Sequence, residues 1–226
     1  MKLFLHGGGG GREDSVELDK KFVLALNLSK PLLYIPIAID TNKYPYPKCL
    51  LWISDLLSPL GVSKIIMWTE DDLKSKTKKD FEQFGGVFIG GGNTFKLLKE
   101  LKDFGTFEIL KNLAENDIPI CGGSAGAIIL SRTIIPALSA DPNDVGLIDF
   151  SALNLLQDYD VWCHYNQSMD TDIKTYMEKY DLKKIIAIPE DAGLFMSEMG
   201  IEAVGPNIIT LFSDKNKIFK PGEYIL

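Results

Sequence analysis

Serine, histidine and carboxylate residues occur in three separate parts of the sequence, each directly after an apolar run. His164 follows a run that ends at Cys163, and Glu190 and Asp191 follow another. Ser124 stands in the segment Ile120-Cys121-Gly122-Gly123-Ser124-Ala125-Gly126-Ala127-Ile128. A serine hydroxyl becomes a nucleophile when a histidine takes its proton and a carboxylate orients that histidine. These residue types could therefore carry out acyl transfer.

The Ser124 segment has the composition of a tight turn between a strand and a helix. Small neighbours, among them Gly123 and Ala125, leave room for a strained nucleophile elbow. A helix that begins at Ala125 would direct its backbone amide toward a developing oxyanion. Two alternatives stay open, because close packing of a strand and a helix, or a phosphate-binding loop, would use the same residues.

The sequence offers two histidines as the base. His164 lies at the end of an expected strand and is followed by polar residues, which favours a base, although a surface histidine would look the same. His6 precedes a run of glycines that resembles the oxyanion loop of lipases, but this loop follows a later strand in those enzymes. We therefore expect a flexible glycine-rich loop after His6. Either Glu190 or Asp191 could orient His164, or face solvent.

A second glycine cluster, Gly90-Gly91-Gly92-Asn93-Thr94, also joins an expected strand to an expected helix. Asn93 or Thr94 can cap that helix. The glycines would expose backbone amides at the same edge of the sheet as Ser124, and one of them could be a second oxyanion donor. The alternative is a tight turn followed by a helix cap.

Short apolar runs alternate with longer amphipathic ones, which predicts an α/β domain over residues 1–226. We expect strands at 3–5, 32–37, 64–68, 87–89, 118–121, 159–163 and 185–188. We expect helices at 16–28, 48–57, 71–84, 94–101, 107–116 and 170–180. This order predicts a mostly parallel sheet flanked by helices, of the flavodoxin-like kind. Four short runs at 193–197, 201–204, 208–212 and 217–219 predict a C-terminal antiparallel meander.

Composition excludes several classes of function. The net charge of −7 argues against a nucleic-acid partner, which requires a positive face. No apolar run approaches the ~20 residues that span a bilayer, so we expect no membrane partner and a cytoplasmic protein. Cys121 and Cys163 adjoin apolar runs and are expected as buried thiols, since three cysteines without regular spacing form no disulfide framework or zinc site. We expect neither a metal nor an organic cofactor; whether the chain is a monomer or a homodimer stays open.

Taken together, these segments resemble the dipeptidase E and cyanophycinase family of serine peptidases. The segments that carry the resemblance are Gly90–Phe95, Gly122–Ala127, His164, Ile188-Pro189-Glu190, Gly205-Pro206-Asn207 and Leu57–Val62. The resemblance implies a fold like that of class I glutamine amidotransferases. It also implies Ser124 as nucleophile, His164 as base and Glu190 as the orienting acid. The implied oxyanion donors are the amides of Ala125 and Gly92.

The expected activity is hydrolysis of short peptides through an acyl-enzyme, with Asn93 and Asp172 as candidates for substrate binding. Dipeptidase E acts on an N-terminal aspartate, and the resemblance implies an arginine after the catalytic histidine. This sequence has acids such as Asp172 there instead, and its arginines are Arg12 and Arg132. The acids would favour a substrate amine or a cationic side chain. An esterase or amidase on the same elbow, or a non-catalytic small-molecule-binding module, are the alternatives.

Overall fold

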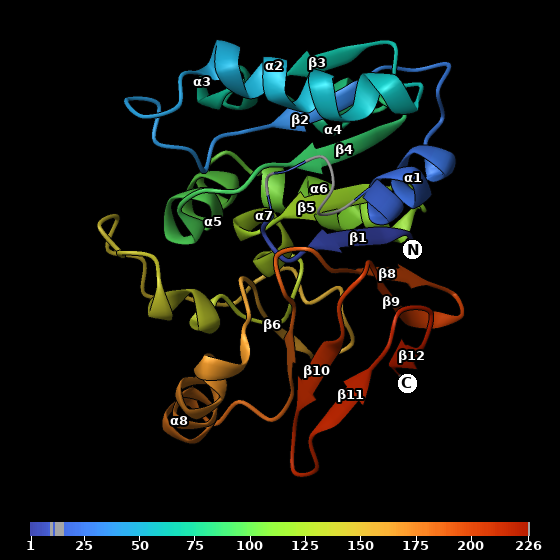
Figure 1. The fold of residues 1–226 in the computed structure, drawn as a ribbon. Helices are drawn as coiled ribbons and strands as arrows, with labels where there is room; N and C mark the ends of the chain where they lie inside the picture. Colours follow the sequence, from blue (N-terminus) through green and yellow to red (C-terminus); the bar gives the residue numbers. More distant parts are fainter. Residues whose placement is uncertain (10, 12–15, 226) are drawn as a thin grey trace.

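The protein is built on an eight-stranded sheet, seen in a computed structural model that describes residues 1–9, 11 and 16–225 (Figure 1). The strand order is β12-β9-β8-β1-β5-β4-β2-β3. Five strands are parallel: β1 (Leu3–His6), β2 (Leu32–Ile35), β3 (Ile65–Met67), β4 (Gly86–Ile89) and β5 (Ile120–Gly123). Three are antiparallel: β8 (Gly193–Ser197), β9 (Gly200–Val204) and β12 (Tyr224–Ile225). Helices cover both faces, so the predicted fold class is confirmed.

Alternate residues of the central strand β1 face opposite sides of the sheet, as the pleat requires. Phe4 packs with α1 (Val16–Ala25) and α2 (Tyr46–Leu57) in one apolar cluster. Leu3 and Leu5 pack in another with α5 (Thr94–Asp103) and α6 (Thr106–Glu115). All three side chains are fully buried. This burial on both faces explains why the strand is a continuous apolar run.

A second, four-stranded sheet lies beyond the main one, in the lower half of Figure 1, with the order β11-β10-β7-β6. Its strands are β6 (Asp160–Trp162), β7 (Ile185–Ala187), β10 (Ile209–Phe212) and β11 (Lys217–Phe219). Helix α8 (Asp170–Tyr180) packs on this sheet through Ile173, in a cluster with Trp162 and Phe212.

The existence of this second sheet corrects two expectations. The strands β6 and β7 are parallel to each other but do not join the main sheet. The C-terminal strands do not form one meander either: β8 and β9 extend the main sheet, whereas β10 pairs with β7 and β11. The reason is that β1 already has β5 on one edge and β8 on the other. No free edge is left in the centre of the main sheet.

The helix expected at 71–84 is divided into α3 (Glu70–Leu73) and α4 (Lys78–Phe81). Each begins with a threonine capping box, and that of Thr77 and Asp80 starts a new helix. Between the two helices, Lys74 is exposed and Lys76 is partly buried. The remaining short elements are α7 (Ala125–Ile128) and 3₁₀ turns at Ser58–Leu60, Ile135–Ser139 and Gln167–Met169.

The three cysteines are buried and unpaired. This confirms the prediction for Cys121 and Cys163. Among the helices of the described residues, none has the length and apolar character needed to cross a membrane.

Candidate active site

The residues predicted to do chemistry gather at the carboxyl edge of the parallel strands, where open α/β sheets place their sites. Ser124 directly follows β5, and its amide donates a hydrogen bond to the carbonyl of His6 at the end of β1 (3.3 Å). Gly91, in the loop after β4, lies against it: a Cβ on Gly91 would be 3.3 Å from Cβ of Ser124. The loops that follow the adjacent strands β1, β5 and β4 therefore meet at Ser124.

Ser124 occupies a strained elbow between β5 and α7. Its φ of 48° and ψ of −107° are unfavourable for a residue with a side chain. The chain can close this tightly because Gly122 and Gly126 lack side chains. A Cβ on Gly122 would lie 2.3 Å from the carbonyl oxygen of Gly126, and one on Gly126 would lie 2.3 Å from that of Ile89.

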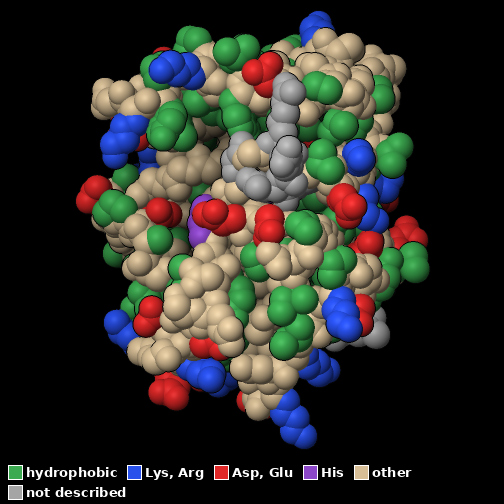
Figure 2. All heavy atoms as spheres, in the orientation of Figure 1, with side chains coloured by type: hydrophobic (Ala, Val, Ile, Leu, Met, Phe, Trp, Pro, Cys, Tyr) green, Lys and Arg blue, Asp and Glu red, His purple; other side chains and the backbone are tan. Residues whose placement is uncertain are grey.

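A chain of two hydrogen bonds links Ser124, His164 and Glu190. Ser124 Oγ lies 2.8 Å from His164 Nε2, and His164 Nδ1 lies 2.8 Å from Glu190 Oε1. A carboxylate accepts only, so we assign the proton to Nδ1, which leaves Nε2 to accept from the serine hydroxyl. The imidazole and carboxylate are partly open to solvent, and Figure 2 shows histidine atoms at the surface beside acidic side chains. The structure thus brings together the three residues singled out in the sequence.

The loop after His6 holds His164 in place. The amide of His164 donates to the carbonyl of Gly7 (2.7 Å), at a positive φ of 55°. Gly8 lies so close to the imidazole that a Cβ there would be 2.1 Å from Cε1. The amides of Gly7 and Gly9 donate to the carbonyls of Ala192 and Glu190. The expected glycine-rich loop is present, and these hydrogen bonds connect Gly7–Gly9 to the loops of His164 and Glu190, whereas its flexibility stays a prediction; Gly10, in the same run, lies outside the described residues.

His6 itself is not part of the triad. Its side chain is buried, and Nε2 lies 3.2 Å from Oδ1 of Asp19 in α1. This contact holds the imidazole inside the fold, away from the serine. His6 therefore contributes to the site through its backbone carbonyl and not through its side chain.

The two neighbouring acids have different roles. Glu190 contacts His164, whereas both carboxylate oxygens of Asp191 accept hydrogen bonds from Nδ2 of Asn207 (2.9 and 2.7 Å). Gly205 lies directly under this turn, since a Cβ there would be 2.6 Å from the carbonyl oxygen of Asp191. The Gly205-Pro206-Asn207 segment therefore supports the loop that presents Glu190.

Backbone amides are available for an oxyanion on both sides of Ser124. Among the described residues, the amides of Ala125 and Gly126, at the start of α7, donate to no backbone carbonyl, and the same holds for Gly91 and Gly92. Gly91 is in direct contact with Ser124. Gly92 has a φ of 138° and is backed by the carbonyl of Ala38. The assignment of Ala125 and Gly92 as donors stays a prediction, with Gly91 as an additional candidate.

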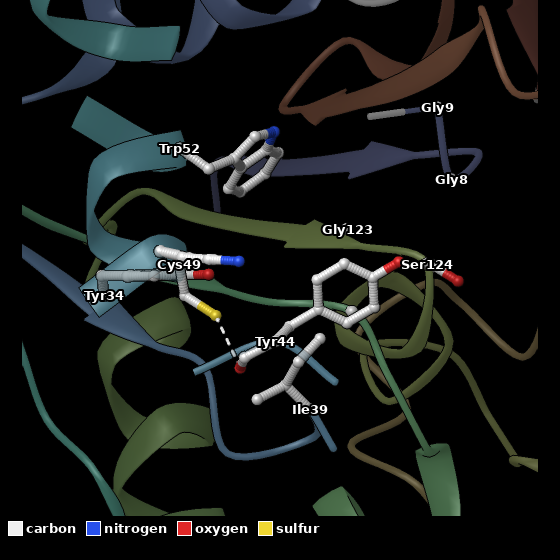
Figure 3. A pocket seen from close by; sticks show the side chains of 11 residues that line it. Gly8, Gly9, Tyr34, Ile39, Tyr44, Cys49, Trp52, Gly123 and Ser124 are labelled. Carbon is white, nitrogen blue, oxygen red and sulfur yellow. Dashed lines mark hydrogen bonds between the residues drawn. The ribbon is translucent and has the colours of Figure 1, made fainter. Parts of the chain in front are cut away.

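Two cavities adjoin Ser124. We call the first the aromatic cavity; it has about 310 Å³ and, beside the glycines and Ser124, is lined by Tyr34, Ile39, Tyr44, Lys48, Cys49 and Trp52 (Figure 3). We call the second the Asp141 cavity; it has about 340 Å³, and its lining includes Ile128, Pro136, Ala137, Asp141, Trp162 and His164. Ser124, Gly8 and Gly91 belong to both walls. The reactive hydroxyl is thus placed between two subsites.

The two residues predicted to bind substrate lie differently. Asn93 caps α5: its Oδ1 accepts from the amide of Lys96 and its Nδ2 donates to the carbonyl of Pro142, both at 2.8 Å. Asp172 is exposed in the first turn of α8 and lines neither cavity. The structure therefore does not bring Asp172 to the site, because α8 packs on the second sheet and presents this carboxylate to solvent.

Sequence reasoning missed Asp141 and the aromatic residues. The carboxylate of Asp141 accepts a hydrogen bond from the amide of Thr94 (2.8 Å) and lines the second cavity. Asp141 lies in an irregular segment, and Tyr34, Tyr44 and Trp52 come from a strand, a loop and a helix. No short motif relates these positions, so no local pattern could have identified them.

The structure does not place an arginine at the site among the described residues, whereas the resemblance to dipeptidase E implies one for an enzyme that binds aspartate. Arg132 pairs with the buried carboxylate of Asp160, at 2.7 Å, and Arg12 lies outside the described residues. Among the described residues that line the two cavities, Lys48 is the only lysine or arginine, and it lines the aromatic cavity.

The buried thiols close to the elbow are poor nucleophiles. Burial raises the pKa of the Cys121 thiol well above its usual range, and it does the same to the pKa of Cys163. The thiol of Cys163 donates a weak hydrogen bond to the carbonyl of Ser124 (3.7 Å). A neutral buried thiol is inert, so neither of these two thiols is a candidate nucleophile.

The fold and the site together define an α/β protein with hydrolase geometry at the carboxyl edge of its sheet. The chain belongs to Peptidase family S51, whose sequence pattern matches residues 3–204. The predicted membership of the dipeptidase E family is thereby confirmed.

Individual relatives agree with this family. Peptidase E of Haemophilus influenzae (strain PittGG) is 27% identical over 144 residues, which cover 59% of each chain. The "Probable alpha-aspartyl dipeptidase" of Drosophila melanogaster is 30% identical over 132 residues, covering 58% of this chain and 50% of the relative. The matches thus span less than two thirds of these two relatives. A crystal structure of a peptidase from an acI-B1 Actinobacterium has the same fold, with a TM-score of 0.76 at 17% identity, over 99% of this chain and 96% of the other.

Proposed function

We propose that this protein is a serine peptidase that hydrolyses short peptides, with Ser124 as nucleophile, His164 as base and Glu190 as orienting acid. The continuous chain of hydrogen bonds through these side chains, with both contacts at 2.8 Å, carries the proposal. Membership of a peptidase family supports it. The names of the relatives, Peptidase E and alpha-aspartyl dipeptidase, point to dipeptides.

The first half of the reaction forms an acyl-enzyme. His164 Nε2 takes the proton of Ser124 Oγ as this oxygen attacks the peptide carbonyl. Glu190 holds the ring through Nδ1 and stabilises the imidazolium that forms. The amide of Ala125 and that of Gly92 or Gly91 hold the oxyanion. His164 then gives its proton to the leaving amine, and the carbon–nitrogen bond breaks.

The second half of the reaction returns the enzyme to its starting state. A water molecule loses a proton to His164 Nε2 and attacks the ester carbonyl at Ser124. The same amides hold the second oxyanion. When the ester bond breaks, Ser124 Oγ regains its proton from His164, and the new carboxylic acid leaves. Every proton in this cycle passes through one nitrogen atom.

The size of the two cavities supports short substrates. At about 310 and 340 Å³, both cavities are at the small end of the range for ligand pockets, and they meet at Ser124. A scissile bond over Ser124 would place one residue in each cavity.

We also place the protein in the cytoplasm. The three unpaired, buried cysteines suit a reducing compartment. Cell fractionation with an antibody against the protein would test this, and recovery in an exported fraction would contradict it.

The experiment that tests the function is a digest of a dipeptide and longer-peptide library, read by mass spectrometry, with Ser124→Ala as the control. We expect the wild type to cleave dipeptides and the variant to lose activity by ~10³-fold or more while keeping its circular dichroism spectrum. Equal cleavage by both would exclude Ser124 as the nucleophile. Turnover of p-nitrophenyl esters without any peptide cleavage would instead indicate an esterase.

A further inference from the structure

The aromatic cavity exposes apolar side chains that a substrate could cover. Tyr44 is 59% exposed and Trp52 is 37% exposed, although both are large and apolar, whereas Tyr34 forms the buried floor. In Figure 3 the ring of Tyr44 points toward Ser124, and the indole of Trp52 stands on the opposite wall. Covering apolar rings releases ordered water and is favourable. A flat or bulky apolar side chain fits between them.

The cavities on the two sides of Ser124 carry opposite charges. Lys48 is the charged residue of the aromatic cavity, and Asp141 is the acid of the other. No carboxylate of the described residues lies within ion-pair distance of the Lys48 ammonium. A free dipeptide has the complementary pattern at neutral pH, with an ammonium at one end and a carboxylate at the other. Charge complementarity therefore sets its direction across Ser124.

We propose that the aromatic cavity binds the carboxyl-terminal residue of a dipeptide. Lys48 binds its α-carboxylate, and Tyr34, Tyr44 and Trp52 surround an apolar or aromatic side chain. This inference rests on the proposed function and specifies its substrate class. The residue in this cavity is the leaving group: its amine takes the proton from His164 as the amide bond breaks. The N-terminal residue forms the ester with Ser124 and has its ammonium on the side of Asp141.

Hydrogen bonds hold the backbone on which two wall residues of the aromatic cavity, Ile39 and Tyr44, stand. The thiol of Cys49 donates to the carbonyl of Tyr44 (3.6 Å), which ties the loop to α2. The ammonium of Lys96 donates to the carbonyl of Ile39 (3.3 Å) and also pairs with Glu70 (3.0 Å). A preformed pocket loses less conformational entropy when a substrate binds. The substrate side chain that enters this cavity can therefore contribute to selectivity.

The first test compares kcat/KM for Ala-Phe, Ala-Ala, Phe-Ala and the amide Ala-Phe-NH₂. We expect kcat/KM of the wild type for Ala-Phe to exceed that for Ala-Ala and for Phe-Ala by about tenfold. Amidation of the carboxylate should lower kcat/KM of the wild type by about fivefold to tenfold. In Lys48→Met the cost of amidation should disappear, since the charge that reads the carboxylate is gone. Lys43→Met is the matched control, because Lys43 is exposed nearby but does not line this cavity.

The second test removes an aromatic wall. Tyr44→Ser should reduce the ratio of kcat/KM for Ala-Phe to that for Ala-Ala toward unity, because the lost ring contacts the phenyl side chain more than the methyl group. Tyr44 is exposed and in a loop, so this variant keeps the fold. An unchanged ratio in Tyr44→Ser would overturn the assignment of the cavity.

A binding measurement separates the two levels of the proposal. The Ser124→Ala variant is titrated with Ala-Phe and with Ala-Phe-NH₂ by calorimetry, with and without Lys48→Met. Suppose that dipeptides are cleaved but that amidation lowers kcat/KM equally in the wild type and in Lys48→Met. The inference about the cavity then fails, and the proposed peptidase activity stands. The same holds if the preference for an aromatic side chain lies in the N-terminal residue. Binding that depends on Lys48, without cleavage by the wild type, supports the cavity and overturns the peptidase. Neither cleavage nor binding overturns both.

Discussion

At the scale of single residues, the site depends on two strained backbone positions. Ser124 and His164 both have a positive φ, of 48° and 55°, which costs about 1 kcal/mol or more for a residue with a side chain. Each is held by one hydrogen bond from its own amide to β1 or the loop after it. In these conformations Ser124 Oγ and His164 Nε2 lie 2.8 Å apart, within hydrogen-bond distance.

The two adjacent acids give a matched pair for testing the orienting carboxylate. Glu190→Gln should lower kcat by about 10²-fold to 10⁴-fold, because an amide can stabilise the wrong tautomer of His164 and not the imidazolium. Asp191→Asn should cost less than about tenfold, since Asp191 contacts Asn207 rather than the imidazole. Kinetics with one well-cleaved dipeptide check both. A larger loss in Asp191→Asn than in Glu190→Gln would contradict the assignment.

Gly8 provides a test of how closely the imidazole is held. Gly8→Ala would place a methyl group 2.1 Å from Cε1 of His164, so the ring must move away from Ser124. We expect kcat/KM to fall by about 10²-fold, as misplaced catalytic groups do. Gly61→Ala is the control: Gly61 also has a positive φ, of 109°, but open space around it. That variant should lose about 1 kcal/mol of stability and retain its kcat/KM; similar kinetics for both variants would be inconsistent with this contact.

At the scale of elements, the loop after β4 depends on the cap of α5. Asn93→Ala removes the acceptor for the amide of Lys96 and the donor to Pro142. We expect a loss of about 1 kcal/mol in the free energy of unfolding in urea, with kcat/KM within about threefold of wild type. An unchanged stability with a tenfold loss of kcat/KM would restore Asn93 as a substrate-binding residue.

The elements could be predicted where local chemistry determines them. The strand before Ser124 and the helix after it follow from an apolar run, small residues and a turn. The break between α3 and α4 is visible in hindsight, because Thr77 and Asp80 form a capping box. The division into two sheets could not be predicted, since it depends on β8 taking the free edge of β1. Strand pairing is a long-range choice that apolar runs do not encode.

The candidate site shows the same limit. The positions of Ser124, His164 and Glu190 could be predicted, because each follows an apolar strand and their order resembles a known family. Asp172 lines neither cavity, since position after the histidine does not fix which way a helix faces. The aromatic cavity could not be predicted from the sequence. Its wall residues Tyr34, Tyr44 and Trp52 come from β2, from the loop before α2 and from α2, and the path of this loop determines how they meet.

At the scale of the whole molecule, the proposed triad forms where the two sheets meet. Ser124 ends a strand of the main sheet, whereas His164 and Glu190 follow β6 and β7 of the second. Backbone hydrogen bonds from His164 to Gly7 and from Gly9 to Glu190 join the two parts at this line. The glycine loop after β1 is therefore the connection that sets the triad geometry, and a change in sheet packing would reach all three side chains.

A half-buried acid outside the proposed triad, Glu100, links the stability of the fold to pH. Burial raises the pKa of Glu100 to about 7 from 4.5, with Glu70 and Asp103 adding to the rise and Lys96 and Lys74 opposing it. Its Oε2 has no hydrogen-bond partner among the described residues. An acid whose pKa is higher in the folded state destabilises the fold as pH rises, because the unfolded chain releases the proton first. The loss of stability begins near pH 4.5 and is complete above about pH 7.

Glu100→Gln should therefore stabilise the protein more at about pH 8 than at about pH 5, because the amide carries no charge at either pH. We expect this difference to be about 1 kcal/mol, reduced from the full shift since Glu100 is only half-buried. Urea unfolding at the two pH values measures it. Glu108→Gln, on the exposed surface of α6, is the control and should show the pH dependence of the wild type. Equal stabilisation by Glu100→Gln at both pH values would contradict the raised pKa. It would show that the Glu100 carboxylate is already ionised in the folded protein at about pH 5.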